Sequence, residues 1–137
     1  MKLLYATFFC LSLLNFQIIS AQNWTGNVDS NWNNSANWSN WPLDGEDLVI
    51  DPAFFTGAMA QPNVSNNSVF SPAAILIQNG GELTIDANLS TEDDVEVFGV
   101  GSAININSGT FEVNFLDGGR LIFEMGSSLT MEGGTLS

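Results

Sequence analysis

From residue 80 onward, one short pattern recurs: a glycine, a small or polar residue, and then apolar residues at alternating positions. Alternation with a period of two indicates a strand that buries one face, and a preceding glycine allows a sharp corner in the chain. No part of this half keeps the three-to-four-residue apolar spacing of a helix. The copies are GGELTI (80–85), GSAINI (101–106), SGTFEV (108–113), GGRLIF (118–123), GSSLTM (126–131) and GGTL (133–136).

The repeat favours an all-β fold of the parallel β-solenoid type. The same motif returns each time, the connections are short, and corresponding units recur at roughly 15–21 residues, as stacked coils require. We expect the copies that start at 80, 101, 118 and 133 to share one face of the coil, and those at 108 and 126 to share the next. The alternative is a β-sandwich, which would more often show Asn-Gly hairpin turns.

The apolar positions of each copy predict which side chains face the interior. In the first copy, Leu83 and Ile85 are expected to point inward, while Glu82 and Thr84 point outward. The same arrangement predicts inward positions for Ile104, Ile106, Phe111, Val113, Phe115, Leu121, Phe123, Leu129 and Met131.

Two segments follow each other without a low-complexity linker. Residues 22–72 form a Trp/Asn-rich N-terminal capping segment, in which EDLVIDP (46–52) reads as a strand ended by Pro52. Residues 73–137 hold the β-solenoid repeats, which we expect to be open at the C-terminus. Because a solenoid needs a polar cap and none follows the last repeat, the chain is expected to be a truncated N-terminal part of a longer protein. Otherwise it stacks end-to-end with itself or with a partner.

Residues 1–21 have the order of a secretory signal peptide. Lys2 gives a positive start, a mostly apolar run follows, and small residues precede the expected cleavage after Ala21. A membrane anchor fits less well, because the run is short, contains Asn15 and Gln17, and lacks a basic flank. We therefore expect a secreted protein, extracellular or at the cell surface, with no membrane insertion after cleavage.

Removal of that leader would leave a strongly acidic chain. The formal net charge of the whole sequence is −13 at pH 7, and without Lys2 a single basic residue, Arg120, would face fifteen carboxylates, for a charge near −14. Nucleic acid is excluded as a partner, because counterion release needs clusters of Lys and Arg.

The residue inventory also limits chemistry. The only Cys and the only Tyr lie in the leader, and the chain has no His. The mature chain therefore lacks the groups for disulfides, for zinc-type sites and for Ser–His–Asp or Cys–His catalysis. A two-carboxylate glycosidase would have to use outward acids such as Asp86, Glu112 and Glu124, but alternating acids are also the ordinary way to keep a strand soluble. We expect no enzyme.

The start of the mature chain carries spaced aromatic, amide and acidic residues: Trp24-x-Gly26, Trp32-Asn33, Ala36-Asn37-Trp38, Pro42, Asp44, Asp47 and LVI at 48–50. This run resembles the mature N-terminus of large secreted bacterial surface proteins of the adhesin and autotransporter-passenger type. In that group, such a segment leads into a right-handed parallel β-helix with Gly-x-Leu-x-Ile repeats. The resemblance implies that architecture and a Gram-negative cell-surface setting, but it says little about activity, because adhesins, filament proteins and polysaccharide lyases share the helix.

The four tryptophans, Trp24, Trp32, Trp38 and Trp41, have two interpretations. They can cover the first coil of the solenoid as an apolar lid, which their position directly before the first strands favours. Alternatively, they can stack on sugar rings, because flat aromatic faces suit sugar C–H groups. Their spacing matches no single strand face, so it predicts no coplanar platform.

An acidic run, Glu92, Asp93 and Asp94, is the candidate metal site. Clustered carboxylate oxygens suit calcium, although the run has neither EF-hand spacing nor the nonapeptide repeat of calcium-bound β-rolls. A solvated corner of the coil is the preferred interpretation, so no cofactor is expected.

These observations together predict an exported structural or adhesive surface protein with no catalytic activity of its own. Its partners are expected to be extracellular glycans or cell-surface components. The alternative is a carbohydrate-binding module that uses the N-terminal tryptophans. A less favoured third class is the N-terminal part of a polysaccharide-degrading β-helix enzyme, with its catalytic groups encoded beyond residue 137.

Overall fold

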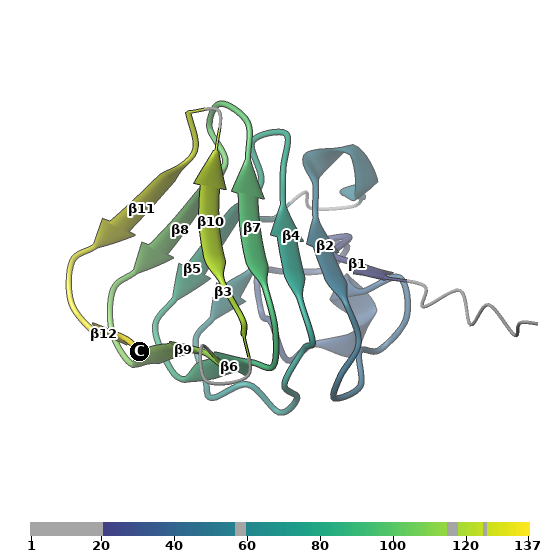
Figure 1. Cartoon of the computed structure of the whole chain (residues 1–137). Helices are drawn as coiled ribbons and strands as arrows, with labels where there is room; N and C mark the ends of the chain where they lie inside the picture. The colour runs from purple at the N-terminus through teal and green to yellow at the C-terminus, as the bar shows by residue number, and fades with distance from the viewer. Residues whose placement is uncertain (1–20, 57–59, 115–117, 125) are drawn as a thin grey trace, which may run out of the picture.

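The computed structural model describes residues 21–56, 60–114, 118–124 and 126–137. They form an all-β fold, a parallel β-solenoid of about four turns, as the repeat predicts (Figure 1). Helix in these residues is limited to two single-turn 3-10 segments, η1 (Ser35–Asn37) and η2 (Pro52–Phe54).

The solenoid has three sides, each a parallel sheet. Side 1 contains β1 (Gln22–Asn23), β2 (Leu48–Ile50), β4 (Ile75–Ile77), β7 (Val95–Phe98) and β10 (Leu121–Glu124) in that spatial order. Side 2 contains β3 (Asn63–Val64), β5 (Glu82–Ile85), β8 (Ala103–Ile106) and β11 (Ser128–Met131). Side 3 contains β6 (Leu89–Thr91), β9 (Thr110–Val113) and β12 (Thr135–Leu136).

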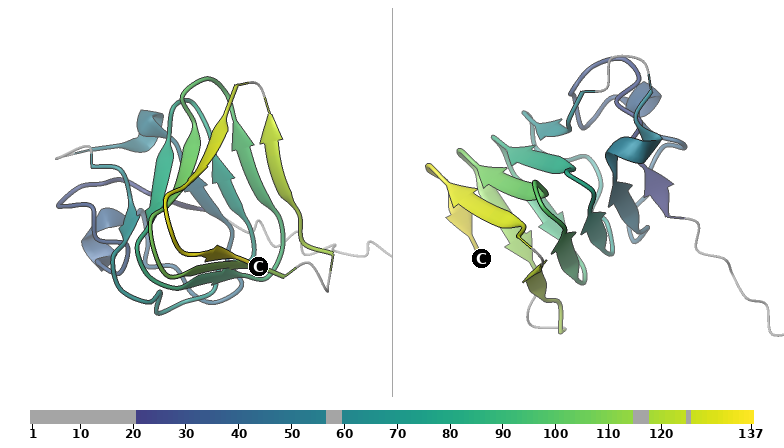
Figure 2. Two further views of the ribbon diagram at one scale, coloured as in Figure 1. Left: turned by 90° about the vertical axis from the view of Figure 1, so that its left-hand side faces the viewer. Right: turned by 90° about the horizontal axis from the view of Figure 1, so that it is seen from above.

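One complete turn of the chain visits the three sides in order. β4, β5 and β6 make one turn, β7, β8 and β9 the next, and β10, β11 and β12 the last. Figure 2 shows the turns stacked one on another, with the C-terminal turn in yellow at one end. Every strand therefore bonds to strands about a turn away in sequence, and a β-sandwich of antiparallel hairpins is excluded for these strands.

The expected assignment of repeat copies to faces was wrong. The copy at 118 leads into β10 on side 1, the copy at 126 joins those at 80 and 101 on side 2, and the copy at 133 joins the one at 108 on side 3. The reason is that the coil has three sides rather than two, and glycines precede strands on all three sides. The register places Val95 beside Ile75 and Leu121 beside Val95, so successive turns take 20 and 26 residues.

The core is a set of apolar ladders that run through the turns. Leu83 lies in register with Ile104, and Ile85 with Ile106, and all four side chains are fully buried. Stacking removes each inward side chain from water on two sides, which stabilises the fold by roughly 1.5–3 kcal/mol per Val, Leu or Ile buried. The predicted inward positions are confirmed for these four and for Phe111 and Val113.

The last turn is less well covered. Leu121 and Phe123 are half-buried against the core, whereas Leu129 and Met131 are 36% and 46% exposed. Leu129 is nevertheless in register with Ile104, as an inward position requires. The predicted inward residue Phe115 lies outside the described residues.

The N-terminal segment supplies the first turn of the stack. β2 pairs in register with β4, and β3 pairs with β5. The strand expected within 46–52 is therefore present as β2, and Pro52 follows it at the start of η2. Residues 22–41 lie against this first turn, because β1 pairs with β2 and Asn31 forms a parallel bridge with Asn63.

Side chains at the corners connect each turn to the following one. The amide oxygen of Asn67 accepts from the backbone N–H of Asn88 at 3.2 Å, and that of Asn88 accepts from the N–H of Thr110 at 3.0 Å. At another corner, the Asp94 carboxylate accepts from the N–H of Arg120 at 2.8 Å. At these corners, side chains of the preceding turn thus satisfy backbone donors of the next turn, as buried or half-buried N–H groups require.

Candidate functional site

Three of the four tryptophans form an enclosed aromatic cluster at the first turn. We call Trp24, Trp32, Trp38 and Phe70 the tryptophan plug. Trp24 and Trp32 expose none of their surface, and Trp38 and Phe70 expose 5% and 6%. The Trp38 ring lies edge-on to both other indoles, at centroid distances of 5.0 and 4.9 Å, and Trp32 stacks on Phe70 at 5.5 Å. Such edge and offset contacts are the favoured geometries of aromatic pairs.

Each buried indole N–H has an acceptor. Trp24 Nε1 donates to the carbonyl of Ala60 at 2.7 Å, Trp32 Nε1 to Ser68 Oγ at 3.0 Å, and Trp38 Nε1 to the carbonyl of Trp32 at 3.0 Å. The plug therefore buries a large apolar area without an unpaired indole donor, as a structural core should.

A buried amide holds the loop around the plug. Asn37 is fully buried, and its Oδ1 accepts from the backbone N–H groups of Val28 and Asp29 at 2.9 and 3.1 Å. Its Nδ2 donates to the Asp29 carboxylate at 2.6 Å and to the carbonyl of Asn31. Hydrogen bonds from Asn37, from the Asn31 backbone and from Asn34 lower the pKa of Asp29 against a smaller opposing effect of burial.

The fourth tryptophan lies outside the plug. Trp41 is 37% exposed and packs edge-on against Phe70 at 5.4 Å. The structure therefore brings Trp24, Trp32 and Trp38 together but presents no common platform of all four. A sugar ring has no access to the faces of Trp24 and Trp32 in this conformation, whereas Trp41 keeps exposed surface.

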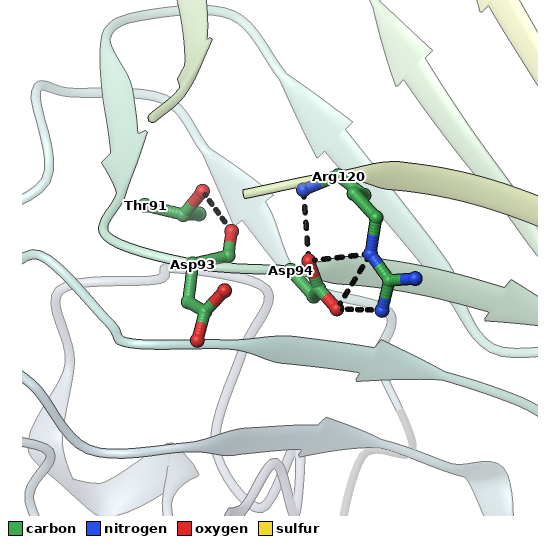
Figure 3. Close-up of polar contacts among 4 residues, drawn as sticks. All are labelled: Thr91, Asp93, Asp94 and Arg120. Carbon is green, nitrogen blue, oxygen red and sulfur yellow. Dashed lines mark hydrogen bonds and ion pairs between the residues drawn. The ribbon is translucent and has the colours of Figure 1, made fainter. Parts of the chain in front are cut away.

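The acidic run lies at the corner between sides 3 and 1. Asp94 is engaged by Arg120, whose Nη2 lies 2.5 Å from Oδ2 and whose Nε lies 3.2 Å from each carboxylate oxygen (Figure 3). Asp93 points away from this pair, and its backbone carbonyl accepts from Thr91 Oγ1. Hydrogen bonds from Arg120 lower the pKa of Asp94, and Asp94 raises the pKa of Arg120.

This arrangement does not bring the predicted calcium ligands together. Glu92 and Asp93 are exposed, and Asp94 already has its cationic partner. Within the part of the chain that the structure describes, no group of three or more His, Cys, Asp or Glu residues is placed to hold a metal ion. A hollow of about 380 Å³ on side 1 is lined by residues that include Val49, Leu76, Asp93, Asp94 and Glu96.

A buried carboxylate at the opposite corner has a structural role. Asp51 is 3% exposed, and its Oδ1 caps η2 by accepting from the backbone N–H of Ala53 at 2.8 Å. Its Oδ2 accepts from Gln78 and Asn79 of the next turn at 2.7 and 2.8 Å. Burial raises the pKa of Asp51, but these hydrogen bonds outweigh it and hold the pKa below its usual range.

Replacement of Asp51 by asparagine is expected to lower the free energy of unfolding by about 1–2 kcal/mol at pH 7, because two amides and a backbone N–H lose a charged acceptor. The folded pKa lies below the unfolded value of about 3.9, so this contribution is present above that pH and disappears as pH falls through the folded pKa. Urea unfolding of both proteins between pH 7 and pH 2.5 measures the difference. A difference that stays constant over this range would contradict the assigned role.

A polar groove on side 3 was not expected from the sequence. It has a volume of about 360 Å³ and is lined by Asn67, Ser68, Asn88, Leu89, Ser90, Thr110 and Glu112. Asn67 and Asn88 are 21 positions apart and occupy equivalent corners of consecutive turns. The 21-residue spacing of these two asparagines is the sequence feature that could have indicated the groove. Corner residues do not follow the alternation of strands, however, and in an Asn-rich chain pairs of asparagines at this spacing also arise by chance.

In the described residues, no helix is both long enough and apolar enough to span a membrane. A scan against protein-family models found no match, and searches of curated proteins and of solved structures found none either.

Proposed function

We propose that this chain is an exported, non-catalytic structural and adhesive surface protein. The observation that carries the proposal is the in-register stacking of parallel turns above an aromatic plug. A solenoid of this kind presents long, uniform faces to its surroundings and extends by adding turns, which suits a surface rod. The outward faces and corners carry acids, amides and hydroxyls, such as Glu112, Asn88 and Thr84, which suit contacts with hydrated polymers.

Export is tested by expressing the full chain in a Gram-negative host. We expect it outside the cytoplasm, with Gln22 as the first residue by N-terminal sequencing. Retention of the leader in a cytoplasmic product would contradict the export part of the proposal.

Adhesion is tested with cells that display the chain on their surface. Displaying cells are expected to be retained on polysaccharide-coated surfaces at least several-fold better than cells that display an unrelated acidic domain of similar size. Equal retention of both would contradict the adhesive part. End-to-end self-association is a separate prediction, and sedimentation velocity at increasing protein concentration checks it.

A carbohydrate-binding module remains the second candidate, and the exposed ring of Trp41 is the observation that favours it. In this alternative, Trp41→Ala abolishes glycan binding while the far-ultraviolet circular dichroism spectrum is unchanged. Trp24 and Trp32 are unsuitable for the same test, because their enclosed rings make any loss of binding inseparable from loss of folding.

A further inference from the structure

We propose that the polar groove on side 3 binds a neutral, hydroxyl-rich glycan. The inference rests on the proposed surface function only for its biological setting, since binding itself is measurable on the purified chain. None of the tryptophans takes part in it, so it is distinct from the aromatic binding mode considered above.

The groove has a wall anchored to the core of the molecule. Ser68 donates its backbone N–H to the carbonyl of Asn88 at 2.8 Å, and its Oγ accepts from Trp32 Nε1 at 3.0 Å. The carbonyl of Asn67 accepts from Asn33 at 3.0 Å. The wall formed by Asn67 and Ser68 is therefore fixed to the plug and to the next turn, which gives a preformed site rather than a loose loop.

The amides of the groove have their orientation set by the fold. Asn67 and Asn88 each use the side-chain oxygen to accept a backbone N–H of the following turn. Their Nδ2 groups have no hydrogen-bond partner within the described residues, and both side chains are exposed. Two amide donors are thus offered to a ligand one turn apart, at the strand spacing of about 4.8 Å.

The other polar residues of the groove offer an acceptor and hydroxyls. Ser90 and Glu112 are register partners on the outer face of side 3, and Glu112 is exposed without an ion-pair partner in the described chain. Thr110 adds a half-buried hydroxyl. Amide donors, hydroxyls and a carboxylate acceptor within one groove match adjacent sugar hydroxyls, which both donate and accept.

Charge decides which glycans fit. The chain carries a formal net charge of −13, and Glu112 lies in the groove itself. Arg120, the only Lys or Arg of the described residues, is bound to Asp94 and does not line the groove. Uronate or sulfate groups would therefore meet like charge with no compensating cation, which disfavours anionic glycans. Because Glu112 is the only charged residue in the lining and the other polar groups are amides and hydroxyls, the ligand is expected to be neutral.

The test is calorimetric titration of the purified full chain with cellohexaose, mannohexaose and an N-acetylglucosamine hexamer, beside alginate and chitosan oligomers. Binding of at least one neutral oligosaccharide is expected. Asn88→Asp keeps the acceptor for Thr110 but removes the amide donor, and should weaken binding by about 3- to 10-fold. Glu112→Gln should weaken it to a similar extent.

Matched controls carry the same chemical changes on side 2. Asn105 and Glu82 lie on its outer face, so Asn105→Asp and Glu82→Gln should leave the affinity unchanged. Thermal melts verify that all four variants fold. The proposal is overturned by a folded chain that binds none of the neutral oligosaccharides, or by binding that only alginate or only chitosan shows. It is also overturned if the groove variants and the controls behave alike.

The outcome is separable from that of the proposed function. Adhesion of displaying cells that survives Asn88→Asp, together with weakened oligosaccharide binding, would support the groove and place adhesion elsewhere on the surface. Normal oligosaccharide binding without cell adhesion would overturn the adhesive function and leave the groove intact.

Discussion

Trp32→Ala is expected to lower the free energy of unfolding by about 3–5 kcal/mol, a large part of the roughly 5–15 kcal/mol typical of a domain. The ring is fully buried and contacts Trp24, Trp38 and Phe70. Its removal leaves a cavity that the three remaining rings cannot close without giving up their edge-on geometry, and it also leaves Ser68 Oγ without its donor. Urea denaturation followed by circular dichroism measures the loss.

Trp41→Ala is the matched control, because it deletes the same side chain where Phe70 is its one aromatic partner among the described residues and 37% of the residue is exposed. We expect a loss of about 1 kcal/mol or less. Equal losses in the two variants would show that the plug contributes no more to stability than a surface ring does.

Gly109→Ala is expected to be as damaging as loss of the plug residue. Gly109 has a φ of +71°, and a Cβ built on it would lie 2.3 Å from the carbonyl oxygen of Ala87 and 2.4 Å from its carbonyl carbon. Because these are backbone atoms of the previous turn, the two turns must separate for the methyl group to fit. We expect a loss of at least about 3 kcal/mol, or failure to fold, measured by thermal melting and yield of soluble protein.

Gly80→Ala separates the strain of a positive φ from the steric clash between turns. Gly80 also has a positive φ, +84°, but a Cβ there would meet no atom within 4 Å. Its substitution should therefore cost only the left-handed strain of about 1–2 kcal/mol. If both alanine variants lose the same stability, the backbone of Ala87 does not approach Gly109 as closely as the structure shows, and the predicted clash between the turns is wrong.

The strand pattern was predictable because it depends on local alternation. Leu83 and Ile85 repeat two residues apart after a glycine, and the physical requirement that one face be buried is visible in the sequence itself. The number of sides was not predictable in the same way. Whether the copies at 118 and 126 lie on one side or on two depends on the angle that each corner makes, and short polar corners of similar composition can make different angles.

The candidate sites were less accessible to sequence reasoning. Asn37 is one of many asparagines in its segment, and only the fold shows that it is fully buried and holds the loop beside Asp29. The partnership of Asp94 with Arg120 joins residues 26 positions apart on consecutive turns. The groove likewise combines corner and strand residues of three turns, and no local sequence pattern predicts such a combination.

The corner caps give the molecule a direction. Asn67 accepts from Asn88, Asn88 accepts from Thr110, and Asp94 accepts from Arg120, so at these three corners the acceptor comes from the turn that is made first. A chain delivered with its amino end first would therefore find side-chain acceptors already in place at these corners. Ordering can then advance from the amino end, with a completed turn as the template for its successor.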